Sequence, residues 1–151
     1  MLRNTAMKYY NGGNWNVVFV GSPGAPRSHC GRSGGHPYST IDSSPVIAEK
    51  PYIIMKGDKY YLMKPKVEFN KKGNTPNWSN ADTIDFENVY VASETDSAAL
   101  ITSKIDAGLH IVLQPGQYNL DDSIQVNKPD VVILGLGMAT LISTTGKACI
   151  E

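Results

Sequence analysis

The chain has 151 residues, which suits one domain of ordinary size with a hydrophobic core. Hydrophobic residues make up 41% and charged residues 19%, a globular composition rather than a disordered one. Lysine and arginine number 14, as do aspartate and glutamate, so no net charge attracts nucleic acid or an anionic membrane surface. We therefore expect neither partner, and no run approaches the roughly 18 to 20 apolar residues of a membrane span.

Residues 1–92 are predicted to form a β-rich extension. The run "NVVFVG" predicts a buried strand, and the segment "SPGAPRSHCGRSGGHPYSTIDSSP" after it, residues 22–45, is dominated by glycine, serine and proline. We interpret that segment as one long loop. Loops of such length within a domain are commonly functional or pinned against other structure.

A hairpin and two further strands are predicted in the second half of the extension. Gly57 and Asp58 separate the β-prone runs "PYIIM" and "YYLM", as the turn of a β-hairpin does. The run "KVEF" alternates like a half-buried strand with Val67 and Phe69 on one face. Residues 70–83 read as a polar loop, and "NVYVA" as a strand.

One helix is predicted, over residues 95–108. Thr95 is the expected N-cap, and Gly108 stands where a helix C-cap would lie. A single apolar stripe follows from the three- and four-residue spacings of Ala98, Ile101, Ile105 and Leu109.

Beyond the helix the apolar period changes to two, and short strands follow one another. Their apolar centres are residues 111–113, 124–126, 131–134, 141–142 and 149–150. A parallel β-helix winds such strands into coils that pack on their neighbours, so its terminal coil needs a cap. We assign that capping role to the helix.

The passage from the helix onward resembles a known family. The quoted positions are "DSAA" at residues 96–99, "IVL" at 111–113, "QPGQY" at 114–118 and "VILGLG" at 132–137. They resemble the entry into right-handed parallel β-helix proteins of the pectin-lyase-like class, closest to glycoside hydrolase family fifty-five, the β-1,3-glucanase-like branch. The implied fold class is mainly β: a β-rich extension, residues 1–92, followed by a capping helix and the first coils, residues 93–151.

The resemblance implies an N-terminal segment of a larger, secreted protein that acts on polysaccharide. In family glucanases the catalytic acid lies much further along than Glu151, so no residue is assigned a catalytic role and the chain alone is expected to be inactive. The alternative is a non-enzymatic carbohydrate-binding or structural, adhesive β-helix module. Exposed β-helix ends also predict a homo-oligomer.

Four residues are candidates for contact with substrate: Trp78, Tyr118, His29 and His36. Aromatic faces suit the apolar side of pyranose rings, although they also bury well in cores. His29, Cys30 and His36 give only three of the four ligands that zinc requires, so we expect no metal, and histidines that bond backbone carbonyls instead.

No cofactor is expected either. Gly135 and Gly137 lack the third glycine and the helix of a dinucleotide fingerprint, and are interpreted as tight corners of the β-helix.

Three further groups could carry chemistry: two sets of acidic residues and the two cysteines. Asp121 and Asp122 are adjacent, so on a strand they would point to opposite faces and could not flank a glycosidic bond; we expect turn formers. A second acidic group, Asp82, Asp85 and Glu87, could hold calcium but fits a solvated turn better. Cys30 and Cys149 are expected to be buried free thiols, with a single bridge as the alternative.

Overall fold

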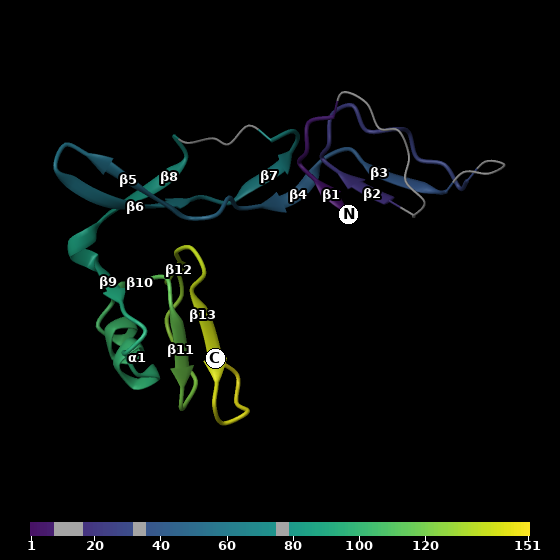
Figure 1. The fold of residues 1–151 in the computed structure, drawn as a ribbon. Coiled ribbons are helices and arrows are strands. Elements are labelled where there is room, and N and C mark those ends of the chain that lie inside the picture. Colours follow the sequence, from purple (N-terminus) through teal and green to yellow (C-terminus); the bar gives the residue numbers. More distant parts are fainter. Residues whose placement is uncertain (8–16, 32–35, 75–78) are drawn as a thin grey trace. The chain divides into compact units, whose positions relative to one another are not determined.

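The computed structural model describes residues 1–7, 17–31, 36–74 and 79–151, and Figure 1 traces its elements. These residues form two compact units. Unit 1 comprises Met1–Glu49 and Pro65–Asn80, and unit 2 comprises Lys50–Lys64 and Ala81–Glu151.

Unit 1 is built from two small sheets. One is parallel and three-stranded, with β1 (Leu2–Arg3), β2 (Val17–Val20) and β3 (Tyr38–Ile41) in that order. The other pairs β4 (Ser44–Ile47) with β7 (Glu68–Lys71) antiparallel. The predicted strand is confirmed in β2, where Phe19 and Val20 are buried but Val18 is 38% exposed. The single loop predicted over residues 22–45 is wrong in part, because β3 and the start of β4 lie inside it and gain strand structure by pairing with other strands.

Polar contacts hold the corner where these strands of unit 1 meet. Asn4 has the left-handed φ of 49°, and its Nδ2 donates to the carbonyl oxygens of Lys71 (3.3 Å) and Gly73 (3.1 Å). Its Oδ1 accepts a hydrogen bond from the buried hydroxyl of Ser44.

The half-buried face predicted for "KVEF" is wrong: Val67 and Phe69 are 51% and 70% exposed.

Unit 2 starts with the predicted hairpin, which is confirmed. Strand β5 (Tyr52–Lys56) pairs antiparallel with β6 (Lys59–Pro65), with Lys56 opposite Lys59 and Gly57 in the turn at φ 63°. Strand β8 (Ala81–Asp85) adds to β6, so the polar loop predicted over residues 70–83 ends earlier than expected.

Stacked parallel coils make up the rest of unit 2. A 3-10 turn, η1 (Phe86–Asn88), leads into β9 (Val89–Ala92); α1 (Ala98–Asp106), β10 (His110–Leu113), β11 (Gln117–Leu120), β12 (Ile133–Gly135) and β13 (Thr140–Ser143) follow. One parallel sheet has the order β12-β10-β9, and β11 pairs parallel with β13. A parallel bridge between Ile124 and Ile150 marks a third side. The predicted class, a mainly β chain with one helix and β-helix coils, is confirmed.

Strand β9 belongs to these coils by its pairing, with Val89 opposite His110 and Ala92 opposite Leu113. The sequence alone predicts that these residues belong to the extension, and the domain boundary at residue 93 stays a prediction. Gly137 has φ 55° and lies between β12 and β13, as expected for a corner. The same prediction is wrong for Gly135, which is the last residue of β12 and lies opposite Leu113.

The helix is shorter than predicted. Its N-cap is Ser97, whose hydroxyl accepts from the amide of Leu100 at 3.2 Å, so the assignment of Thr95 as N-cap is wrong. Thr95 instead shares a hydroxyl–hydroxyl hydrogen bond of 2.8 Å with Ser93. Gly108, at φ 91°, follows the helix end as expected.

The sheet β12-β10-β9 is apolar on both faces. Successive side chains of a strand point to opposite faces, so Ile111 and Leu113 enter one apolar cluster while Val112 enters another. The first cluster includes the helix residues, and the second includes Leu62 of the hairpin. Burial on both sides explains why "IVL" is a continuous apolar run rather than an alternating one.

Candidate functional site: the helix-covered first coil

Helix α1 closes the apolar interior of the first coil. Ala98, Ile101 and Ile105 have no exposed surface and belong to the same cluster as Ile111 and Tyr118. Each fully buried isoleucine contributes about 1.5–3 kcal/mol relative to an exposed one. The stripe predicted from the sequence is therefore the face that holds the helix on the coil.

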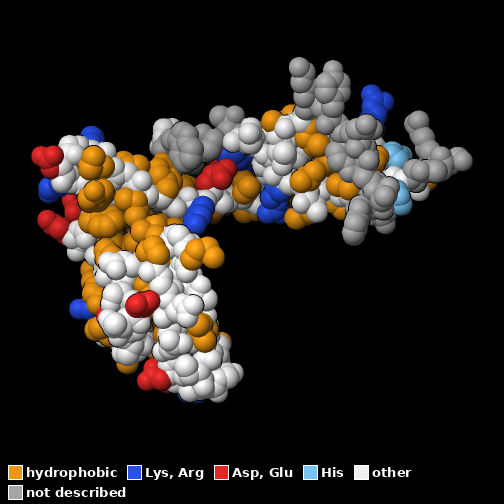
Figure 2. Space-filling model, in the orientation of Figure 1, with side chains coloured by type: hydrophobic (Ala, Val, Ile, Leu, Met, Phe, Trp, Pro, Cys, Tyr) orange, Lys and Arg blue, Asp and Glu red, His pale blue; other side chains and the backbone are white. Residues whose placement is uncertain are grey.

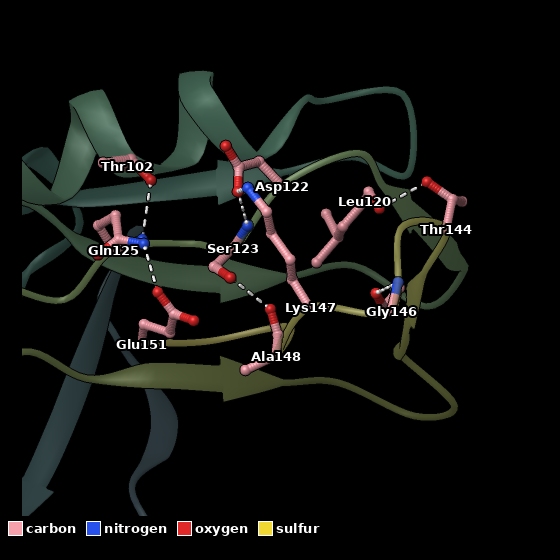
Figure 3. Close-up of polar contacts among 11 residues, drawn as sticks. Thr102, Leu120, Asp122, Ser123, Gln125, Thr144, Gly146, Lys147, Ala148 and Glu151 are labelled. Carbon is pink, nitrogen blue, oxygen red and sulfur yellow. Dashed lines mark hydrogen bonds and ion pairs between the residues drawn. The ribbon is translucent and has the colours of Figure 1, made fainter.

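Backbone pairing shows how the helix substitutes for a neighbouring coil. The amide of Ile124 donates to the carbonyl of Cys149, and the amide of Glu151 donates to the carbonyl of Ile124, both at 3.0 Å. On the other edge of this segment, the amide of Gln125 donates to the Thr102 hydroxyl at 3.0 Å (Figure 3). A helix side chain thus accepts the bond that an additional strand would otherwise accept.

A second polar contact joins the helix to the coil at its other end. The ammonium of Lys128 donates to the carbonyl oxygen of Asp106, in the last turn of α1. A cation at that position also interacts favourably with the helix dipole. Neither Thr102 nor Lys128 was predicted as functional, because both contacts join residues far apart in sequence.

The corner after β11 is fastened to the coil that follows it. Asp122 Oδ1 accepts from the amide of Ser123 and from Lys147 Nζ, both at 2.8 Å, and Ser123 Oγ donates to the carbonyl of Ala148 at 2.6 Å (Figure 3). The carbonyl of Leu120 accepts from both the amide and the hydroxyl of Thr144 at 2.9 Å. Bonding from Lys147 lowers the pKa of Asp122, so this carboxylate stays ionised. The prediction of a turn former is confirmed for Asp122.

Tyr118 lies inside the core and not on a binding surface. Its ring has no exposed area, and its hydroxyl lies within hydrogen-bond distance of the carbonyls of Ala92 (2.9 Å) and Gln114 (3.0 Å). Burial raises the pKa of this phenol. Its ring therefore offers no face to a sugar, contrary to the predicted role; the alternation with Leu120 was the available signal for burial.

Two of the other predicted contact residues belong to unit 1, whereas Tyr118 belongs to unit 2. His29 and His36 belong to unit 1, where His29 is half-buried and lies edge-on to Tyr38 with ring centroids 4.7 Å apart. The Nδ1 of His29 accepts from the amide of Gly31 at 3.1 Å, rather than donating to a carbonyl as expected. His36 is exposed, and Trp78 lies outside the described residues. Their substrate-binding roles stay predictions.

A polar cluster that the sequence did not reveal surrounds the start of the helix. Asp96 Oδ2 accepts from the Tyr90 hydroxyl and from the amide of Ser93, both at 3.0 Å. This bond to Asp96 raises the pKa of Tyr90, and the ammonium of Lys104 lies 5.0 Å from the centre of the Tyr90 ring. Glu94 Oε2 accepts from the amide of Gln117 at 3.3 Å. These groups fix the path between β9 and α1.

Within the described ranges, no group of three or more histidine, cysteine, aspartate or glutamate side chains is placed to hold a metal ion. Cys30 and Cys149 are free, as expected, but Cys30 is exposed and Cys149 half-buried, so the predicted burial is wrong for Cys30. Among the helices of the described residues, none has the length and apolar character needed to span a membrane.

A covered coil of parallel strands defines the chain as a β-helix protein, and comparison with known proteins narrows the class. Residues 89–151 match the family model of the LAM55 pectate lyase-like domain. Over 99% of its length the chain is 31% identical to an exo-beta-1,3-glucanase of Streptomyces sp. (strain SirexAA-E / ActE). The resemblance to the β-1,3-glucanase-like branch is thereby confirmed.

Solved structures agree with this similarity. The structure of sacteLam55A from Streptomyces sp. SirexAA-E matches with a TM-score of 0.83 at 30% identity over 98% of the chain. A variant of sacteLam55A in complex with glucose matches with a TM-score of 0.85 at 31% identity. The chain spans about a quarter of these relatives, 24% of the curated protein and 27% of each solved chain.

Proposed function

We propose that this chain forms the helix-covered start of the β-helix in an extracellular β-1,3-glucanase-like glycoside hydrolase, without supplying the catalytic acid. The supporting observation is its similarity, over 99% of its length, to an exo-beta-1,3-glucanase. The chain contributes the first coil and the helix that protects it, on which later coils stack.

The non-catalytic part of this proposal is supported by the contacts of the coil's carboxylates. Asp96 accepts from Tyr90 and Ser93, Asp122 accepts from Lys147, and Glu94 accepts from the amide of Gln117. Glycoside hydrolysis requires an acid and a base or nucleophile that face each other across the sugar. Carboxylates committed to turns and strand ends serve the fold instead.

A chimera provides the test. The corresponding segment of the Streptomyces exo-beta-1,3-glucanase is replaced by this chain, and sugar release from laminarin is measured for the chimera and for the isolated chain. We expect an active chimera and an inactive isolated chain. Sugar release by the isolated chain would overturn the non-catalytic assignment, and a folded but inactive chimera would contradict the proposed place in the hydrolase.

A matched pair of substitutions shows whether the helix cover is what the chimera needs. Ile101 is fully buried, whereas Leu100, its neighbour on the same helix, is 37% exposed. We expect Ile101→Asp to abolish activity by unfolding the first coil, and Leu100→Asp to retain most of it. Equal activity of the two variants would show that the helix cover is dispensable.

Carbohydrate binding without catalysis is the second candidate function, and one surface of unit 2 favours it. Tyr60 is 54% exposed and lies 5.9 Å, centre to centre, from the ring of Phe86, and Met55, opposite Tyr60 in the hairpin, is 65% exposed. Figure 2 shows hydrophobic side chains gathered over this part of unit 2. An exposed ring on a rigid hairpin can stack against the apolar face of a pyranose.

Affinity electrophoresis in laminarin checks this second function. We expect Tyr60→Ala to weaken retardation of the chain by about twofold to tenfold, the range of one aromatic contact. Phe69→Ala, which removes a 70% exposed ring from unit 1, is the control and should leave retardation unchanged. If laminarin did not retard the wild-type chain, the carbohydrate-binding function would be refuted.

Self-association is a separate expectation, based on the strand edges of β12 and β13, which lie at the ends of their sheets in the described chain. Unpaired edges favour pairing with another chain. Light scattering at high concentration should report a species larger than a monomer, and a monomer at every concentration would refute the expectation.

A further inference from the structure

His110, the first residue of β10, makes a side-chain bond that continues a strand ladder. The carbonyl of Val132 accepts from the amide of Ile111 at 2.8 Å, as in a regular parallel pair. The amide of Val132 donates to Nδ1 of the His110 ring at 3.1 Å. Because β12 starts at Ile133, the imidazole adds one bond between the two coils before β12 begins.

This bond requires a neutral ring. An imidazole nitrogen can accept a hydrogen bond only while it is unprotonated, so His110 must carry its single ring proton on Nε2. Val132 is only 6% exposed, so its amide would lack water if the ring nitrogen took up a proton. A buried amide without an acceptor is costly.

The surroundings of His110 keep the ring neutral. Burial and the positive charge of Lys64 on β6 lower its pKa, and the carboxylate of Asp130, in the turn before β12, opposes them. Lys64 is itself held by Asp130 at 3.2 Å and by Asp82 of β8 at 3.9 Å. The charged groups around His110 therefore come from β6, β8 and the turn before β12.

We propose that His110 is a proton-sensitive clasp: protonation of its Nδ1 releases the Val132 amide and opens the first contact between β10 and β12. The ring proton comes from solvent, and no covalent bond changes. This device is independent of the proposed hydrolase function, since it concerns the stacking of the coils themselves.

The direction of the pH effect follows from proton linkage. An unfolded histidine titrates near pH ~6.5, whereas folded His110 titrates below its ordinary value. Between these two values the unfolded state binds the additional proton, so stability increases with pH. The contribution of the clasp is complete above about pH 6.5 and is lost as pH decreases toward the lowered pKa of the folded chain.

Nitrogen-15 NMR of the 151-residue chain tests the clasp, because only three histidines contribute ring signals. At neutral pH we expect the His110 ring to have a protonated Nε2 and an unprotonated, hydrogen-bonded Nδ1. On acidification through its transition, the exchange protection of the Val132 amide should decrease about fivefold or more relative to that of the Gln125 amide, which bonds to the Thr102 hydroxyl.

Substitutions of His110 distinguish loss of the hydrogen-bond acceptor from protonation of the ring. In His110→Asn the side-chain oxygen occupies the position of Nδ1 and does not titrate, so protection of Val132 should persist at all pH values. His110→Phe should lose that protection at all pH values, and His36→Asn, at an exposed site, should behave as wild type. The proposal is overturned by a wild-type ring protonated on Nδ1 at neutral pH, or by His110→Asn retaining the full pH dependence.

Discussion

Each unit contains a parallel sheet, but the strands of the two sheets are held together by different interactions. In the described part of unit 1 the buried apolar residues are Phe19 and Val20, and buried polar groups from Asn4, Ser22 and Ser44 join its strands. Unit 2 has two apolar clusters on the two faces of one sheet, and a helix that closes the first of them. A short parallel sheet can thus be specified by hydrogen bonds from a few polar side chains or by burial of many apolar ones.

This contrast predicts different weak points. In unit 2, loss of apolar volume should be the costliest change, because many side chains share one core and a cavity removes contacts from all of them. In unit 1, loss of a single polar side chain should matter most, because several strand ends bond to the same group.

The largest effect is expected from Ile101→Ala in α1. The side chain is fully buried, so truncation should lower the free energy of unfolding of unit 2 by about 2–5 kcal/mol. Urea unfolding monitored by residue-resolved NMR can separate the units. Leu100→Ala is the matched control, and an equal loss in both variants would show that the apolar stripe is not what binds the helix.

Asn4→Gly should be the most damaging polar substitution in unit 1. Glycine accepts the φ of 49°, so this change removes the side-chain bonds to Lys71, Gly73 and Ser44 without straining the backbone. Stability should decrease by about 1–3 kcal/mol, measured by exchange protection of unit 1 amides. Asn70→Gly, at a similar φ of 52° on an exposed residue, is the control. If Asn4→Gly caused no loss of stability, the hydrogen bonds of Asn4 would not be what holds the strands of unit 1 together.

Thr102→Val tests the bond by which the helix replaces a strand. Valine preserves the shape of threonine but cannot accept the amide of Gln125, so we expect a loss of about 1–2 kcal/mol and faster exchange of that amide. Thr95→Val, in the turn before the helix, serves for comparison. If the exchange rate of the Gln125 amide did not change, water would be as good an acceptor for it as the Thr102 hydroxyl.

The smallest effect concerns the start of the helix. Ser97→Ala should cost about 1 kcal/mol through loss of the cap to Leu100, and Thr95→Ala should cost clearly less. Thermal unfolding followed by circular dichroism compares the two variants. The reverse order would restore the N-cap that the sequence suggested.

Local signals in the sequence were sufficient to predict much of the structure of unit 2. Gly57 and Asp58 predicted the hairpin turn, the spacing of Ile101 and Ile105 predicted the buried helix face, and Gly108 predicted its end. Each of these features depends on residues a few positions apart, where chain geometry limits the possibilities.

Features that depend on contacts between residues far apart in the sequence could not be predicted from local signals. Strand β3 lies in a segment rich in glycine, serine and proline and gains its structure from pairing with β2. The contact of Thr102 with Gln125 and that of His110 with Val132 involve ordinary residues whose roles arise only when the coils stack. Among the candidate site residues, Tyr118 showed that an aromatic side chain suits a core as well as a sugar, and only burial distinguishes the two.

The position of α1 in the chain also sets an order of events during synthesis. The helix precedes the coil that it covers, and the strand pairings of the coils join each strand to one from the coil before it, as in β10 with β9 and β13 with β11. Strand β9 and the helix are therefore synthesised before the strands that pack on them, and each later strand meets a partner that already exists. We expect folding to proceed vectorially from the helix, with each new strand finding its neighbour already in place.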